Sequence, residues 1–153
     1  MPLLTGTLVE ATVGEIRIKV LITNAVDEAL ARRGQIDKKD IRTYEADAMV
    51  DAGAVRSVIP THVMQRLGIQ ERGQRVAEYA DGRKETVGIT EPIIFDLLGR
   101  DTMEEALVLG DEVLIGQTVL EKLDLLADCA NRRLIPNPAH PDQPVTKVKS
   151  VPQ

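Results

Sequence analysis

Aromatic residues are scarce in this chain of 153 residues, which contains one Phe, two Tyr and no Trp. Stacking on bases or sugars requires exposed aromatic rings, so the chain has almost no material for it. The formal net charge of −5 also opposes association with a phosphate backbone. We therefore expect an aliphatic core and no nucleic-acid partner.

Cysteine and histidine are equally scarce. The single cysteine, Cys129, cannot form an internal disulfide. The two histidines, His62 and His140, lie far apart in the sequence without the spacing of metal ligands. We therefore predict that the chain holds no metal.

Long hydrophobic runs are also missing. No window approaches the roughly 20 apolar residues of a membrane-spanning helix, and the first residues lack a basic stretch followed by an apolar one. We therefore predict a cytoplasmic protein that does not bind membranes. The length, with 43% apolar and 28% charged residues, is typical of one globular domain.

Short alternating segments dominate the chain and predict a mainly β protein. Asn24 suits the cap of a short helix that ends at Gly34, which suggests a helical insertion at 24–40. Prolines are frequent after residue 135 and predict a flexible tail at 137–153 behind a domain at 1–136. Strands are expected at residues 10–13, 16–22, 44–51, 55–59, 75–79, 83–87, 89–98, 106–109, 113–116, 123–128 and 132–135, and further helices from Pro60 to Gly68 and over 117–122.

One carboxylate stands where chemistry is expected. The alternating strand at 44–51 ends in Asp51-Ala52-Gly53-Ala54, and a later apolar run ends in Ile115-Gly116 before the helix at 117–122. Peptide hydrolysis by carboxylates requires two acids that share a proton. Because the chain has one segment of this kind, the second acid must come from another copy across a two-fold axis.

These segments resemble the retropepsin-like aspartic proteases, and residues 14–136 resemble a single-domain, bacterial-type relative of the retroviral proteases. The resemblance implies an all-β, closed-barrel acid protease fold with one or two short helices, assembled as a homodimer. It also implies a polypeptide substrate, water as the nucleophile and no cofactor. It assigns Asp51 as the catalytic acid, Gly53 and Ala54 to the turn beneath the substrate, and Ala52, Ile115 and Gly116 to the active-site turn at the dimer axis.

A hairpin between these segments falls where the family has its flap. Asp81-Gly82 is a dipeptide that tight hairpin turns prefer. By resemblance, Tyr79, Ala80, Asp81 and Gly82 would cover bound substrate. The alternative is a plain turn in which Tyr79 packs against the neighbouring strand.

Ala52 departs from the family pattern, which has Thr or Ser at this position. In the family this hydroxyl forms hydrogen bonds across the subunit interface, and alanine has neither a donor nor an acceptor. We expect an aspartic endopeptidase with weakened or conditional assembly. The alternative function is an inactive retropepsin-like module that dimerises or binds an extended peptide by strand pairing.

Overall fold

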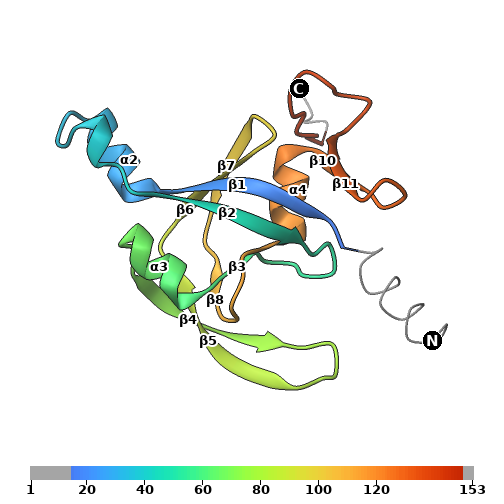
Figure 1. Cartoon of the computed structure of the whole chain (residues 1–153), viewed down its shortest axis with the longest axis horizontal. Helices are drawn as coiled ribbons and strands as arrows, with labels where there is room; N and C mark the ends of the chain where they lie inside the picture. Colours follow the sequence, from blue (N-terminus) through green and yellow to red (C-terminus); the bar gives the residue numbers. More distant parts are fainter. Residues whose placement is uncertain (1–14, 150–153) are drawn as a thin grey trace, which may run out of the picture.

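The computed structural model describes residues 15–149, which form a mostly β domain with a few short helices (Figure 1). The strand expected at residues 10–13 lies outside the described residues. The helices are α2 (Ala25–Arg32), the 3-10 helix η1 (Lys38–Asp40), α3 (Thr61–Leu67) and α4 (Gln117–Leu123). The strands are β1 (Arg17–Asn24), β2 (Thr43–Val50), β3 (Val58–Ile59), β4 (Glu71–Glu78), β5 (Lys84–Thr90), β6 (Ile93–Leu97), β7 (Arg100–Glu104), β8 (Leu107–Val108), β9 (Leu114–Ile115), β10 (Leu125–Asp128) and β11 (Arg133–Pro136).

Nine of the described strands form one curled sheet in the order β4-β5-β8-β3-β9-β2-β1-β6-β7. Strands β10 and β11 form a separate two-stranded sheet. Strands β4 and β7 are the two ends of this order and do not pair with each other, so the nine strands make a half-barrel. Closure into a barrel stays a prediction. The mainly β architecture expected from the sequence is confirmed.

The core is aliphatic, as expected. In β2 the alternation places Ala46 and Ala48 inside, while Glu45 and Asp47 point outward. The single phenylalanine, Phe95, is fully buried on β6. The other large side chains that are fully buried are aliphatic and come from most of the sheet and from two helices: Ile22, Ile59, Leu67, Ile89, Ile93, Leu97, Ile115 and Leu123.

The helix expected after Asn24 is confirmed as α2. The side-chain oxygen of Asn24 accepts a hydrogen bond from the backbone N–H of Asp27 at 3.0 Å, and Gly34 follows with a positive φ of 77°. The Asn24 amide donates to the carbonyl of Leu67 at the end of α3 at 2.8 Å. One buried side chain therefore joins two helices to the sheet.

Buried Asp27 holds the chain that returns from α2 to β2. Its carboxylate accepts hydrogen bonds from Arg42 Nε at 2.8 Å, from Arg42 Nη2 at 3.0 Å and from the Arg42 backbone N–H at 3.0 Å. The side-chain hydrogen bond from Arg42 lowers the pKa of Asp27 against the opposing effect of burial. The ionised carboxylate is therefore part of the fold.

Some predicted boundaries are wrong. Pro60 is the N-cap of α3 and not its first helical residue, because its ψ of 159° is extended. The single strand expected at 89–98 is interrupted between Thr90 and Ile93, where Pro92 has no N–H for a ladder. Strand β7 was not predicted, because its polar residues at 100–104 lack an alternating apolar pattern.

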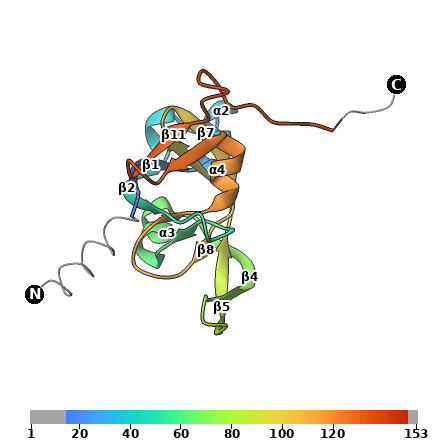
Figure 2. The same ribbon diagram turned by 90° about the vertical axis from the view of Figure 1, so that its right-hand side faces the viewer.

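Residues 137–149 contain no helix or strand, and the last of them extend away from the body (Figure 2). The beginning of this segment is nevertheless bound to Asp124, which follows α4. The Asp124 carboxylate accepts from Asn137 Nδ2 at 3.0 Å and from the Val145 N–H at 3.1 Å, and it lies 2.7 Å from His140 Nδ1. The hydrogen bond from Asn137, followed by those from Val145 and His140, lowers the pKa of Asp124.

We predict that Asp27→Asn lowers the free energy of unfolding at neutral pH by about 1–3 kcal/mol, because it removes a buried charge-assisted hydrogen bond to Arg42. The pKa of Asp27 is lower in the folded chain than in the unfolded one. The wild-type advantage is therefore complete above the usual carboxyl pKa and is lost as the pH falls through the folded-state value. Urea denaturation at a series of pH values measures this change.

The matched control is Asp37→Asn, because Asp37 is exposed and makes no side-chain capping bond. It should change the free energy of unfolding by less than about 0.5 kcal/mol. A difference between wild type and Asp27→Asn that stayed constant down to the most acidic pH would contradict the role of the ionised carboxylate.

Candidate active site

The loop of residues 51–57 crosses the end of β9. Strand β9 lies between β2 and β3, parallel to β2 with Val50 opposite Ile115 and antiparallel to β3 with Val58 opposite Leu114. The chain must therefore pass over β9 to go from β2 to β3. We call residues 51–57 the crossing loop.

Asp51 is the first residue of the crossing loop. Its backbone N–H donates to the Ile115 carbonyl at 2.8 Å, which continues the β2–β9 pairing by one residue. Its Oδ1 accepts from the Gly53 N–H at 3.1 Å, and its carbonyl accepts from the Ala54 N–H at 3.1 Å. The side chain is half-buried, and Oδ2 has no hydrogen-bond partner within residues 15–149. One carboxylate oxygen is thus bound within the loop, and the other has no hydrogen-bond partner in that range.

The middle of the crossing loop is hydrogen-bonded to the first turn of α4. The N–H groups of Gln117 and Thr118 donate to the carbonyls of Ala54 at 2.8 Å and of Val55 at 3.1 Å. These N–H groups have no partner inside the helix, so the loop serves as its cap. The Gly116 N–H donates to Ser57 Oγ at 2.9 Å, and Ser57 is fully buried.

Gly116 is required because another backbone passes directly over it. A Cβ atom at this position would lie 2.5 Å from the carbonyl carbon of Arg56 and 2.9 Å from the backbone nitrogen of Ser57. Gly53 differs, since a Cβ there would meet Asp51 Oδ1 at 3.4 Å, an ordinary contact. The close approach at Gly116 fixes the loop against α4.

The hairpin predicted around Asp81-Gly82 is confirmed as the β4–β5 hairpin, which projects from the body (Figure 2). Gly82 has a positive φ of 87°, and Asp81 Oδ1 accepts from the Arg83 N–H at 2.9 Å. The Arg83 guanidinium lies 4.5 Å from the centre of the Tyr79 ring. Ala80 is exposed beside them.

The predicted site residues thus fall into two groups within one chain. Asp51, Gly53, Ala54, Ile115 and Gly116 come together at the crossing, with Ala52 exposed at its tip. Residues 79–82 form the hairpin tip, and no hydrogen bond joins them to the crossing loop in the described part of the chain. Whether these residues bind substrate stays a prediction.

Two polar residues of the crossing were not predicted. Ser57 accepts the hydrogen bond from Gly116, and Thr118 Oγ1 donates to buried Glu104 at 2.8 Å. A signal for Ser57 was present, because it is a hydroxyl residue inside the apolar segment 55–59. Thr118 gave no comparable signal, since threonine is ordinary in the first turn of a helix.

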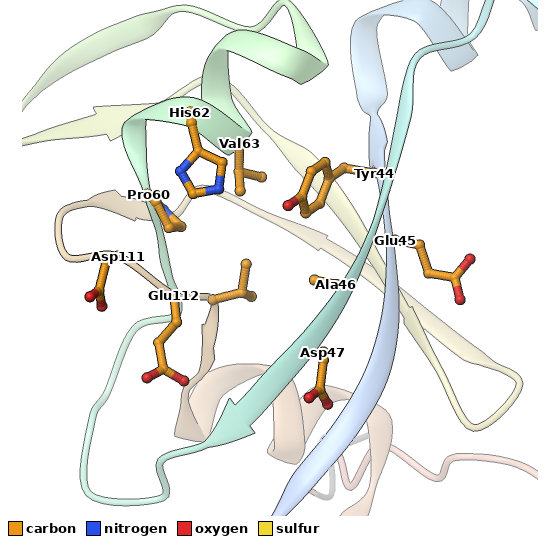
Figure 3. Close-up of a pocket in the computed structure, with 10 residues that line it drawn as sticks. Tyr44, Glu45, Ala46, Asp47, Pro60, His62, Val63, Asp111 and Glu112 are labelled. Atoms are coloured by element: carbon orange, nitrogen blue, oxygen red, sulfur yellow. The ribbon is translucent and has the colours of Figure 1, made fainter.

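A separate shallow pocket lies between β2, α3 and the segment before β9 (Figure 3). Tyr44 and His62 face each other across it, with ring centres 6.3 Å apart. Asp111 and Glu112 lie at its other side. None of its lining residues belongs to the crossing loop, so this pocket is not the Asp51 site.

Within residues 15–149, no group of three or more His, Cys, Asp or Glu side chains is placed to hold a metal ion. In the same range, no helix is long and apolar enough to cross a membrane. Cys129 is exposed in the turn between β10 and β11.

No protein-family model and no curated protein sequence matches this chain. Among solved structures, the chain is similar to the solution structure of the Simian Foamy Virus (mac) protease, at 14% identity and a TM-score of 0.43, over 68% of this chain and 90% of that one. The EIAV protease complexed with the inhibitor HBY-793 matches at 18% identity and a TM-score of 0.44, over 69% of this chain and 84% of that one.

The retroviral protease-like domain of Ddi1 from Leishmania major matches at 17% identity and a TM-score of 0.49, over 90% of this chain and 94% of that domain. The solved structures that the chain is similar to thus include two retroviral proteases and a retroviral protease-like domain. These similarities concern the fold. The bacterial-type assignment stays a prediction.

We predict that Gly116→Ala lowers the free energy of unfolding by about 1–3 kcal/mol, because the new Cβ must displace the backbone of Arg56 and Ser57. Gly53→Ala is the matched control and should change it by less than about 1 kcal/mol, since its Cβ has ordinary room. Denaturant unfolding of both variants measures the difference. Equal stability of the two variants would mean that the close approach at Gly116 does not constrain the loop.

Proposed function

We propose that this protein is an aspartic endopeptidase in which Asp51 from each of two identical chains forms the catalytic pair. The observation that carries this proposal is the crossing loop. It holds a half-buried carboxylate at the end of an apolar strand, with one oxygen bound to the Gly53 N–H. A catalytic pair that two chains share requires each chain to hold one acid on a well-fixed backbone.

The chemistry explains why two chains are needed. One ionised carboxylate activates a water molecule as a base, and a second, protonated carboxylate donates a hydrogen bond to the peptide carbonyl. A single Asp51 cannot do both at once. A two-fold axis beside the exposed tip of the crossing loop would place the same residue of each chain face to face.

The β4–β5 hairpin is the element that would cover a bound peptide. It projects as a two-stranded arm (Figure 2), and its tip at residues 79–82 has no sheet neighbour other than itself among the described residues. An arm of this kind can close over an extended chain and exclude water during hydrolysis. In this proposal the tip contacts the substrate, and the closed barrel forms when the two chains assemble.

Ala52 supports a second candidate function. The tip of the crossing loop is exposed and carries a methyl group where a hydroxyl would bond the other chain. If assembly is too weak to bring two carboxylates together, the same fold would act as a module that dimerises or binds a peptide without cleaving it. Activity of the Asp51 variant separates the two functions.

We predict that the wild-type protein cleaves unfolded polypeptides with a bell-shaped pH dependence and a maximum between about pH 4 and 6. The bell shape arises because only the singly protonated pair contains both the base and the acid. Asp51→Asn should lower kcat by at least about 100-fold, the usual contribution of such a group. A peptide-cleavage assay with and without a chelator measures these effects.

Asp37→Asn serves as the control, because it removes an exposed carboxylate that belongs to neither the crossing loop nor the hairpin. It should leave kcat and the pH profile unchanged. Full cleavage by Asp51→Asn, or activity that a chelator abolishes and added metal restores, would reject the carboxylate mechanism.

We predict that Ala52→Thr tightens the dimer roughly tenfold or more, since two symmetric hydroxyls each add a hydrogen bond of about 0.5–1.5 kcal/mol. Analytical ultracentrifugation over a range of concentrations measures the dissociation constant. Ala80→Thr adds the same side chain at the exposed hairpin tip and should leave the constant unchanged. A wild-type protein that is active and monomeric at every assay concentration would rule out the shared pair.

A further inference from the structure

The Glu105 carboxylate lies between two guanidinium groups that come from distant parts of the chain. Its Oε2 is 2.7 Å from Nη1 of Arg72 on β4. Its Oε1 is 3.9 Å from Nη1 of Arg56 in the crossing loop. One side chain therefore connects the hairpin with the loop that carries Asp51.

The backbone on either side of Glu105 is fixed to different elements. Glu104, which is buried, accepts a hydrogen bond from Thr118 at 2.8 Å and pairs with Lys122 at 3.0 Å, and both partners belong to α4. On the other side, buried Ala106 is bound to Thr90 by two hydrogen bonds. The Ala106 N–H donates to Thr90 Oγ1 at 3.0 Å, and the Ala106 carbonyl accepts from the Thr90 N–H at 2.9 Å. Glu105 is thus held in place between α4 and the end of β5.

A β-bulge directs Arg72 to this carboxylate. Glu71 lies opposite Thr90 and Gly73 lies opposite Ile89, so Arg72 is an extra residue in β4 without a partner in β5. A bulge of this kind changes the direction of the side chain and bends the strand. The position matters because the bulge is at the base of the projecting arm.

The arm beyond this base has little other support from the sheet. Strand β5 pairs with β8 at Gly88 and Ile89, and beyond them residues 75–78 and 84–87 pair only with each other among the described strands. An arm that moves as a unit turns at its base. A contact at the base therefore determines the position of the tip relative to the crossing loop.

We propose that Glu105 is a positioning residue that holds the β4–β5 hairpin over the crossing loop by bridging Arg72 and Arg56. This inference rests on the proposed function, in which the hairpin covers a peptide bound at Asp51. The side chains of Arg72 and Glu105 are 53% and 27% exposed, so solvent weakens the bridge. A bridge of this kind can break when the arm opens for substrate entry.

The test is hydrogen exchange on the full chain, followed by mass spectrometry, for the wild type and for Glu105→Gln and Arg72→Gln. Both variants should exchange amides of residues 73–88 about two- to fivefold faster than the wild type, as expected for an exposed ion pair. About 1 M salt should remove the difference by screening the bridge in the wild type. Arg72→Gln also tests the bridge without altering the segment between β7 and β8.

Arg75→Gln is the matched control. It lies on the same strand, and its guanidinium donates to the carbonyl of the adjacent Gln74 without an acidic partner among residues 15–149. Its exchange should equal that of the wild type. The proposal is overturned if Glu105→Gln exchanges like the wild type, or if β1 and β2 accelerate equally, because that would be a general loss of stability.

Peptide cleavage provides a second measurement. Glu105→Gln should raise KM about two- to fivefold and leave kcat and the pH profile unchanged, because the bridge acts on the cover and not on the reacting groups. A lowered kcat with an unchanged KM would overturn the positioning role. If the wild type cleaves no peptide, the proposed function fails, and the exchange experiment still decides whether Glu105 positions the hairpin.

Discussion

The passage of the crossing loop over Gly116 is the constraint on which the rest of the site depends. The order β2-β9-β3 requires the chain to cross β9, and the crossing leaves no space for a side chain at position 116. The same contact lets the loop carbonyls cap α4 and lets Ser57 bind the Gly116 N–H. The direction of the Asp51 carboxylate therefore follows from backbone packing, and a small displacement at Gly116 would be transmitted to it.

Outside this centre, buried polar groups attach the periphery to an aliphatic core. Asn24 and Asp27 hold the segment between β1 and β2, and Arg100 donates to the carbonyls of Leu123, Asp124 and His140. Buried hydrogen-bonding groups cost free energy when a partner is lost, so these attachments are specific. Because the pKa of both Asp27 and Asp124 is lowered, strong acid should loosen the segment between β1 and β2 and the C-terminal segment before it affects the core.

The sequence predicts those elements whose determinants are local. The cap at Asn24, the glycines at positions 34 and 68, and the Asp81-Gly82 turn each act within a few residues, and all are confirmed. Strand β7 was not predicted because its buried residues are the polar Arg100 and Glu104, whose partners in α4 come later in the sequence. Glu105 was not predicted either, because its partners lie at positions 56 and 72, far from it in the sequence. The bulge that directs Arg72 toward it also leaves no pattern in the sequence.

The effect of Ala52 can be separated from the shape of the loop. The bonds that shape the crossing come from the backbone of residues 51, 53, 54 and 55, from Asp51 Oδ1 and from the Ser57 hydroxyl, and none uses the side chain at position 52. Ala52 is exposed, so its side chain is accessible to another chain. In the proposed dimer, a hydroxyl at this position would act between chains, because the loop within one chain is already closed by the bonds named above. In that case alanine would weaken the proposed dimer and leave the loop that holds Asp51 unchanged.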